Sequence, residues 1–249
     1  MNKFGLIGFP LTHSFSKKYY DAKIEREQIS GIGYELYPIP AITDFPALVE
    51  NEPKLMGINV TIPYKIAVMN YLDRLSPEAE AIAAVNCIRI ERNNGKPLLT
   101  GYNTDVDGFT ASLRPLLKPH HDAAIILGNG GAAKAVSFAL GQLGIAHTVV
   151  SRAARNGQLT YAQLDAAVIG IHPLIINTTP LGTYPDVTGC PDIPYDLLDD
   201  RHLLYDLVYN PPETEFLKRG KAQGAATKNG LEMLERQAER NWEIWNAGG

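Results

Sequence analysis

A glycine-rich turn is the segment of the sequence whose chemistry is easiest to interpret. The residues Gly128-Asn129-Gly130-Gly131-Ala132-Ala133 follow an apolar run and open an Ala-rich stretch. Gly128 permits a tight turn, Gly130 lets the backbone approach a pyrophosphate, and Ala133 lets a helix pack closely on a strand. Phosphates are then favoured at the helix N-terminus by exposed N–H groups and the helix dipole. A tight turn without a ligand is the alternative, but the strand–turn–helix–strand context favours a dinucleotide.

The residues after the next apolar run indicate which dinucleotide is bound. An NAD site offers an Asp or Glu to the ribose 2′-hydroxyl about 20 residues after the glycine turn. Here the run ends in Ser151-Arg152-Ala153-Ala154-Arg155, with no acid in reach. Two guanidinium groups and a hydroxyl suit a 2′-phosphate, because Arg can bind phosphate through paired hydrogen bonds. The segment therefore predicts NADP, bound by Ser151, Arg152 and Arg155; a solvated basic loop is the alternative.

The elements that must position these residues alternate as in an α/β protein, with short apolar runs between amphipathic stretches. The later part of the chain predicts strands at 123–127, 146–150, 174–177 and 203–207, and helices at 130–143 and 231–245. The earlier part predicts strands at 4–8 and 56–61, and a hairpin of strands 86–91 and 97–102 around Asn93-Asn94-Gly95. It also predicts a helix from about 16 to 28 capped by Ser14 or Ser16, a helix over 64–75 after Pro63, and a helix start at Ser76-Pro77-Glu78.

Composition narrows the classes of partner. The 249-residue chain carries a net charge of −4 without a long run of one sign, so a nucleic-acid backbone is not an expected partner. No apolar run approaches the ~20 residues of a bilayer span, so no membrane association is expected. Cys87 and Cys190 show neither metal-ligand spacing nor a disulfide framework, and the histidines suggest no metal site. A reducing cytoplasm is the expected compartment.

Several short blocks together resemble shikimate dehydrogenases. They keep the order of that family and span almost the full chain, and their combination is far more specific than any one block. The blocks are His13-Ser14-Phe15-Ser16, Gly57-Ile58-Asn59-Val60-Thr61-Ile62-Pro63-Tyr64-Lys65, Ala84-Val85-Asn86, Gly101-Tyr102-Asn103-Thr104-Asp105, Gly128 to Ala133, Asn177-Thr178-Thr179-Pro180-Leu181-Gly182, and Gly230-Leu231-Glu232-Met233-Leu234 with Gln237.

The resemblance implies an enzyme that reversibly reduces 3-dehydroshikimate to shikimate with NADP, in aromatic amino-acid biosynthesis. It implies that Ser14 and Ser16 bind the substrate carboxylate, where hydroxyl donors beside a helix start form a reasonable anion site. Taken alone, both serines are ordinary helix caps. The resemblance further implies that the ring hydroxyls are hydrogen-bonded by neutral side chains that both donate and accept, as a polyol requires. These residues are Asn59, Thr61, Asn86 and Gln237, and Tyr209 reaches the substrate from the other domain. Alone, Asn59 could satisfy a loop backbone, Asn86 could cap the hairpin, and Tyr209 is part of a strand that runs into a turn.

Lys65 and Asp105 are the expected catalytic residues. Hydride reduction of a ketone requires a proton donor at the developing alkoxide, and the reverse reaction requires a base there. The resemblance gives this role to the Lys65–Asp105 pair. A surface lysine and a helix cap for Val106 to Leu116 are the ordinary alternatives.

The remaining implied residues belong to the cofactor. Besides Gly128, Asn129, Gly130, Gly131 and Ala132 of the turn, the resemblance assigns Thr178, Pro180 and Gly182 to a cofactor loop, and Gly230 and Met233 to the nicotinamide. The expected architecture is two α/β domains around a cleft: a substrate domain of residues 1–104 and 231–249, and a Rossmann-like NADP domain of residues 105–230.

Other functions stay open at this point. An NAD-dependent quinate/shikimate dehydrogenase would share the fold, although the Arg152/Arg155 loop argues against NAD. A non-catalytic sensor of shikimate or quinate could dispense with Lys65 or Asp105, yet both are present. Fold analogy alone admits a folate-linked dehydrogenase, but the polar set suits a flat pterin poorly. The sequence leaves monomer and homodimer equally open.

Overall fold

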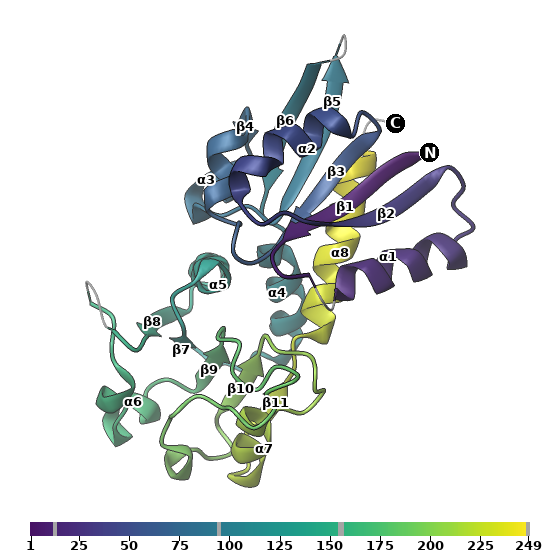
Figure 1. The fold of residues 1–249 in the computed structure, drawn as a ribbon. Coiled ribbons are helices and arrows are strands. Elements are labelled where there is room, and N and C mark those ends of the chain that lie inside the picture. The colour runs from purple at the N-terminus through teal and green to yellow at the C-terminus, as the bar shows by residue number, and fades with distance from the viewer. Residues whose placement is uncertain (12–13, 94–95, 154–156, 248–249) are drawn as a thin grey trace. The chain divides into compact units, whose positions relative to one another are not determined.

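The structure, a computed structural model, describes residues 1–11, 14–93, 96–153 and 157–247 (Figure 1). The chain divides into two compact units, Met1–Thr104 with Gln237–Gly249, and Asp105–Arg236. One division falls between Thr104 and Asp105. The other falls inside a helix, between Arg236 and Gln237, rather than before it. Each unit contains its own sheet.

The first unit is built on a six-stranded mixed sheet with the order β2-β1-β3-β5-β6-β4. Strands β1, β2 and β3 run parallel, whereas β5 pairs antiparallel with both β3 and β6. The hairpin predicted around Asn93 is confirmed by the β5–β6 pairing; residues 94–95 of its loop lie outside the described residues. The strands are β1 Asn2–Gly8, β2 Ile32–Pro38, β3 Leu55–Val60, β4 Arg74–Leu75, β5 Cys87–Asn93 and β6 Lys96–Tyr102, and the helices of the first unit are α1 Phe15–Arg26, α2 Phe45–Asn51 and α3 Pro77–Ile82.

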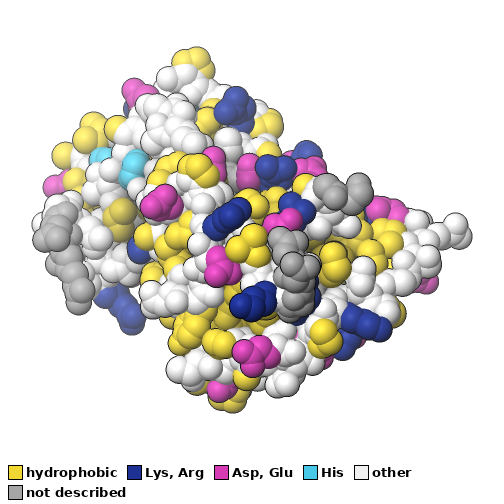
Figure 2. Space-filling model, turned by 90° about the horizontal axis from the view of Figure 1, so that it is seen from above, with side chains coloured by type: hydrophobic (Ala, Val, Ile, Leu, Met, Phe, Trp, Pro, Cys, Tyr) yellow, Lys and Arg dark blue, Asp and Glu magenta, His cyan; other side chains and the backbone are white. Residues whose placement is uncertain are grey.

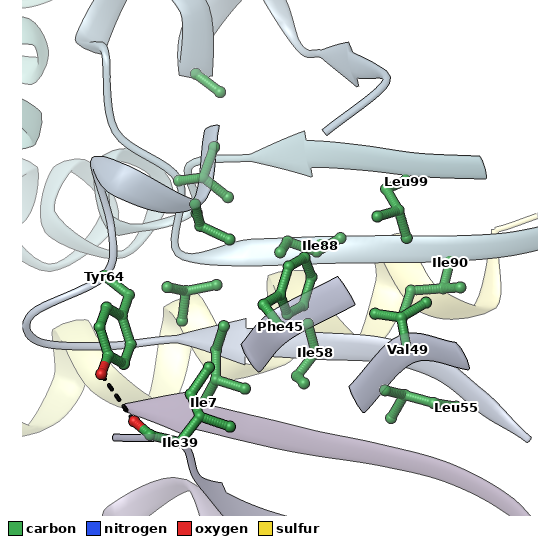
Figure 3. Close-up of a cluster of buried hydrophobic side chains, with 14 residues drawn as sticks. Ile7, Ile39, Phe45, Val49, Leu55, Ile58, Tyr64, Ile88, Ile90 and Leu99 are labelled. Atoms are coloured by element: carbon green, nitrogen blue, oxygen red, sulfur yellow. Dashed lines mark hydrogen bonds between the residues drawn. The ribbon is translucent and has the colours of Figure 1, made fainter. Parts of the chain in front are cut away.

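The two faces of this sheet bury different cores, because side chains alternate along a strand. Ile7 of β1 belongs to an aliphatic cluster with Phe45 and Val49 of α2, shown in Figure 3. Phe4 and Leu6 belong instead to an aromatic cluster that includes Tyr20, Tyr34, Trp242 and Trp245. The Phe4 and Trp245 rings stack with centroids 4.7 Å apart. The C-terminal helix is therefore bound to the sheet of the first unit by aromatic packing.

The second unit is built on a five-stranded sheet with the order β11-β10-β9-β7-β8, in which every neighbouring pair is parallel. The runs Ile125–Leu127 and Leu174–Asn177 are fully buried, as expected of strands covered on both faces. The strands are β7 Ala123–Leu127, β8 Ala146–Val150, β9 Leu174–Asn177, β10 Leu203–Asp206 and β11 Ala226–Lys228, and the helices are α4 Asp105–Leu113, α5 Gly131–Gln142, α6 Ala166–Gly170, α7 Glu215–Ala222 and α8 Leu231–Asn246, whose last turns belong to the first unit. The predicted two-domain α/β class with a Rossmann-like sheet is confirmed.

The helix predicted over residues 64–75 is wrong. The segment forms only a 3₁₀ helix, Ala67–Tyr71, followed by β4. Its backbone is hydrogen-bonded outside the segment: Val85 N–H donates to the Lys65 carbonyl at 2.7 Å, and Asp73 N–H donates to the Leu99 carbonyl at 3.0 Å. Tertiary hydrogen bonds thus outweigh local helix propensity. Lys65 consequently lies in a turn, not in the first turn of a helix.

Four features of the surface, the helices and the ionisable groups bear on possible partners and ligands. Figure 2 shows Lys and Arg side chains intermixed with Asp and Glu on the face in view. In the part of the chain that the structure describes, no helix is long and apolar enough to cross a bilayer, and no group of His, Cys, Asp and Glu could hold a metal ion. Cys87 is buried and Cys190 is partly exposed, and both are free thiols.

Candidate active site

The order of the parallel sheet places a topological switch point at the end of β7. From β7 the chain moves to β8 on one side, and it later returns to β9 on the other side. Ligands of open α/β sheets bind at such a switch point, outside the carboxyl ends of the strands. The loops that leave β7 and β9 here begin at Gly128 and Thr178, and Thr178 N–H donates to the Leu127 carbonyl at 2.9 Å. The predicted glycine turn and the predicted cofactor loop are thereby brought together.

Gly128 and Gly130 have different physical reasons for being glycine. Gly128 has φ +109, and a Cβ there would lie 2.6 Å from Thr178 Oγ1. Its lack of a side chain therefore allows both the turn and the close approach of the two loops. A Cβ on Gly130, which precedes α5, would meet no protein atom within 4 Å. The space over Gly130 is open to a ligand, as a bound pyrophosphate requires.

The N-terminus of α5 completes this part of the site. Asn129 and Gly130 are exposed, Gly131 and Ala132 are partly exposed in the first turn of the helix, and Ala133 is buried against the sheet. The described residues of the turn thus fit a dinucleotide pyrophosphate: exposed backbone, open space and a helix N-terminus of a full 12-residue helix. The predicted α5 begins one residue later than expected, at Gly131.

The residues predicted to bind a 2′-phosphate follow β8, the neighbour of β7. Arg152 is exposed, and its charge opposes the burial that raises the pKa of Tyr161. Ser151 is buried, and its hydroxyl lies 2.9 Å from the Ala153 carbonyl and 3.2 Å from Gln158 Oε1. Ser151 therefore holds its own loop in shape. Arg155 lies outside the described residues.

The loops that follow β9 and β10 are connected by a buried polar network, which the sequence analysis missed. Asp206 at the end of β10 accepts hydrogen bonds from Asn177 Nδ2 at 2.9 Å, from Val208 N–H at 3.0 Å and from Thr214 Oγ1 at 2.5 Å. Asn177 Oδ1 in turn accepts from the backbone and hydroxyl of Thr179. Burial raises the pKa of Asp206 to about 6, although these hydrogen bonds act in the opposite direction.

The remaining predicted cofactor residues follow β9 and β11, and Tyr209, which is predicted to contact the substrate, follows β10. Pro180 is exposed and Gly182 is buried with φ +84. A Cβ on Gly182 would lie 2.9 Å from the Gly189 carbonyl oxygen. Gly230 packs directly on the Leu207 backbone, where no side chain fits, and Met233 is buried in α8. Tyr209 is partly buried in the loop after β10, and burial raises the pKa of its hydroxyl.

In the first unit, the two predicted carboxylate ligands lie at the start of α1. Ser14 is the N-cap, and its hydroxyl accepts a hydrogen bond from Lys17 N–H at 3.2 Å. The capping role that the sequence allowed for Ser14 is therefore present. Ser16 lies in the first turn of the helix and is partly exposed. Both serines remain at a helix start, where an anion is favoured.

The predicted substrate amides are buried and hydrogen-bonded to one another. Asn59 Nδ2 donates to the Asn86 carbonyl at 3.3 Å, and Asn59 Oδ1 accepts from Tyr34 at 2.8 Å. Asn86 Nδ2 donates to Thr104 Oγ1 at 3.0 Å. The first unit thus links Asn59 and Asn86 directly, and Tyr34, a residue that the sequence analysis missed, donates to Asn59.

The C-terminal helix extends the same set. Thr104 Oγ1 donates to Asn241 Oδ1 at 2.6 Å, and Asn241 Nδ2 donates to Gln237 Oε1 at 3.0 Å. The described residues therefore contain a continuous path of hydrogen bonds from Tyr34 to Gln237. Thr104 and Asn241 were missed as well. They are buried polar residues of the kind that need partners, but only the fold reveals the partners.

The two predicted catalytic residues are placed as follows. Lys65 is partly exposed in a turn whose carbonyl accepts from Val85 N–H, next to Asn86 in the chain. Thr61 is partly buried after β3 and packs on Gly8. Asp105 is buried and begins α4, directly after Thr104. Asp105 thus follows in the chain from Thr104 of the buried polar path, and the Lys65 backbone is hydrogen-bonded to Val85, the residue before Asn86.

Comparison with known proteins gives the family. Residues 6–88 match the family model described as "Shikimate dehydrogenase substrate binding domain". The chain is 40% identical over 258 residues to a protein of Clostridium beijerinckii named shikimate dehydrogenase (NADP(+)), covering 98% of this chain and 92% of the relative. It is 36% identical over 264 residues to a protein of the same name from Caldanaerobacter subterraneus subsp. tengcongensis, covering 97% and 90%.

A solved structure agrees with these relatives. Shikimate 5-dehydrogenase from Thermus thermophilus, in complex with NADP(H) and shikimate, superposes with a TM-score of 0.85 at 30% identity, over 99% of this chain and 94% of the other. Sequence and fold therefore agree over nearly the whole length of both proteins. The chain belongs to the shikimate dehydrogenase family.

Proposed function

We propose that this chain is an NADP-dependent shikimate dehydrogenase, which reversibly reduces 3-dehydroshikimate to shikimate in aromatic amino-acid biosynthesis. The observation that carries the proposal is the buried path of amides and hydroxyls from Tyr34 to Gln237 in a member of this family. A ring that carries several hydroxyls needs such neutral donors and acceptors. The unit of residues 1–104 and 237–249 is accordingly the substrate-binding domain.

The other unit is the cofactor domain. A bound NADPH supplies a hydride for the ring carbonyl carbon. The N–H groups of Gly130, Gly131 and Ala132 hold the pyrophosphate at the start of α5, and Gly128 keeps the turn tight. Arg152, with Arg155, binds the 2′-phosphate. Thr178, Pro180, Gly182, Gly230 and Met233 line the nicotinamide side, and Asn129 and Ser151 complete the adenosine side.

The chemistry of the substrate domain follows from its residues. Ser14 and Ser16 bind the ring carboxylate, and Asn59, Thr61, Asn86, Gln237 and Tyr209 orient the ring through its hydroxyls. Lys65 donates the proton to the alkoxide oxygen that develops as the carbonyl is reduced, and Asp105 holds Lys65 in place and shares the proton. In the reverse direction, the same pair removes the proton from the hydroxyl.

An assay of NADP reduction with shikimate tests the proposal, run in parallel with quinate and with NAD. We expect fast turnover only for shikimate with NADP. Turnover with NAD or quinate would contradict the specificity but keep the catalytic pair. Binding of shikimate without turnover would favour a sensor over an enzyme.

The setting of the protein is part of the same proposal. Two free cysteines and no disulfide between them suit the reducing cytoplasm. Size-exclusion chromatography with light scattering separates the two expected states, monomer and homodimer.

A further inference from the structure

An amide side chain offers opposite chemistry at its two ends, a donor at nitrogen and an acceptor at oxygen. Which end of Asn59, Asn86 and Gln237 faces a ligand therefore decides which ligand groups they can bind. In this structure the orientations are not independent. Each is fixed through hydrogen bonds that end on backbone groups, which can only donate or only accept.

Asn86 is fixed first. Thr104 N–H, which can only donate, lies 2.8 Å from Asn86 Oδ1. The nitrogen of Asn86 must then face Thr104 Oγ1, at 3.0 Å. Because this hydroxyl accepts from Asn86, its own hydrogen is available for Asn241 Oδ1 at 2.6 Å.

Asn59 is fixed from two sides. Its Nδ2 faces the Asn86 carbonyl, which can only accept. Its Oδ1 must therefore accept, and Tyr34 donates to it at 2.8 Å. The Tyr34 hydroxyl thus sets which end of the Asn59 amide accepts.

Gln237 is fixed through Asn241. Thr104 Oγ1, whose hydrogen is available, donates to Asn241 Oδ1 at 2.6 Å and so sets the acceptor end of the Asn241 amide. The nitrogen of Asn241 therefore faces Gln237 Oε1, which lies 3.0 Å away. Asn241 is fully buried, and each end of its amide has a partner. The donor end of Gln237 is consequently directed away from Asn241.

We propose that Tyr34 and Asn241 are positioning residues that set the donor and acceptor directions of Asn59 and Gln237, so that Gln237 recognises an acceptor oxygen of the substrate through Nε2. The inference rests on the proposed function for the identity of the substrate. It assigns substrate selectivity to two buried side chains, which act on the substrate only through Asn59 and Gln237.

The first experiment compares Asn241→Leu and Tyr34→Phe with Tyr64→Phe. Tyr64 is a matched control, because it is also buried in the first unit and donates one hydrogen bond, to the Ile39 carbonyl at 2.7 Å, outside the amide path (Figure 3). We expect the KM for shikimate to rise about tenfold in Asn241→Leu and about fivefold in Tyr34→Phe, as for loss of one buried hydrogen bond. The KM for NADP stays within about twofold in all three variants, and Tyr64→Phe keeps the KM for shikimate.

The second experiment is a double-mutant cycle of Asn241→Leu with Gln237→Met. If Asn241 acts through Gln237, the two effects on the KM for shikimate are not additive, and Asn241→Leu costs less in the Gln237→Met background. Full additivity, an unchanged KM for shikimate in a folded Asn241→Leu protein, or an equal rise in both KM values overturns the proposal. If thermal melting shows that Asn241→Leu does not fold, the Tyr34→Phe and Tyr64→Phe pair decides.

Failure of the proposed function is seen separately, in the wild-type protein. A wild type that binds shikimate in calorimetry without turnover refutes the enzyme, and the same variants are then compared by shikimate affinity. A wild type that neither turns over nor binds shikimate overturns the proposed function and this inference together.

Discussion

In the second unit, the residues that predict the nucleotide site act through the backbone, whereas in the first unit the predicted substrate residues act through side chains. Gly128 and Gly130 serve by lacking a side chain, and the start of α5 supplies N–H groups. Asn59, Asn86 and Gln237 instead need specific partners from distant segments. The residues of a site that is made from backbone groups can form one contiguous sequence motif, whereas the residues of a site that is made from side chains are distributed along the chain.

Replacing Lys65 tests the side-chain site most strongly. In Lys65→Ala, we expect turnover to fall by about 10²–10⁴, the usual contribution of a positioned proton donor. Substrate affinity should change little, since the ring hydroxyls are bound elsewhere. Steady-state kinetics with shikimate and NADP measures both quantities, and near-normal turnover would refute the proton-transfer role.

The network around Asp206 is an exception to this comparison between the two units, because it is a buried side-chain network in the second unit. Its pKa of about 6 lies above the ordinary value of 3.8, so between these pH values the folded state binds a proton that the unfolded state has released. Stability therefore falls as the pH rises from about 4 to about 6, by roughly 2–3 kcal/mol, and this loss persists above pH 6. Asp206→Asn should remove this slope in urea unfolding measured across that range. A slope that survives the substitution belongs to another group.

Two glycine variants sharpen the comparison. Gly128→Ala places a side chain at φ +109 and against Thr178, which should lower the free energy of unfolding by about 1–3 kcal/mol and raise the KM for NADP. Gly130→Ala meets no protein atom, so its stability should match wild type while the KM for NADP still rises. Thermal melts and kinetics separate these results. A normal KM for NADP in Gly130→Ala would show that no phosphate approaches there.

Arg152 is the described side chain to which we give the 2′-phosphate, in a nucleotide site whose pyrophosphate is held by backbone groups. In Arg152→Ala, we expect the KM for NADP to rise about tenfold while the KM for NAD is unchanged, because only NADP carries the 2′-phosphate. The exposed Arg201, paired with Asp199, is a control of the same type in the same unit. Equal changes with both cofactors would assign Arg152 to a general electrostatic role.

The elements that the sequence predicted correctly are those with local signals. Strands β7, β8 and β9 have the predicted bounds, because short, largely apolar runs between turn residues are typical of parallel strands. Strand β2 was missed, since Ile32–Pro38 mixes Gly, Glu and Pro with its apolar residues. The helix over 64–75 failed because tertiary hydrogen bonds took its backbone groups.

The candidate site, like the fold, was predicted only in part from the sequence. The family blocks contain every amide of the substrate side, but not the residues that orient them. Tyr34 lies 25 residues from Asn59, and Thr104 lies 137 residues from Asn241. No periodicity or spacing connects such pairs, and a buried Tyr or Asn is identified as a partner only after the chain has folded.

The buried path from Tyr34 to Gln237 also constrains how the protein could evolve. Because its hydrogen bonds end on two fixed groups, Thr104 N–H and the Asn86 carbonyl, reversing one amide forces its neighbours to reverse or to lose a partner. A change of substrate on this side therefore requires simultaneous substitutions, and single steps along that route pass through poorer enzymes. Epistasis of this kind would make the substrate domain slow to diverge in specificity, whereas the cofactor loop after β8 can change one residue at a time.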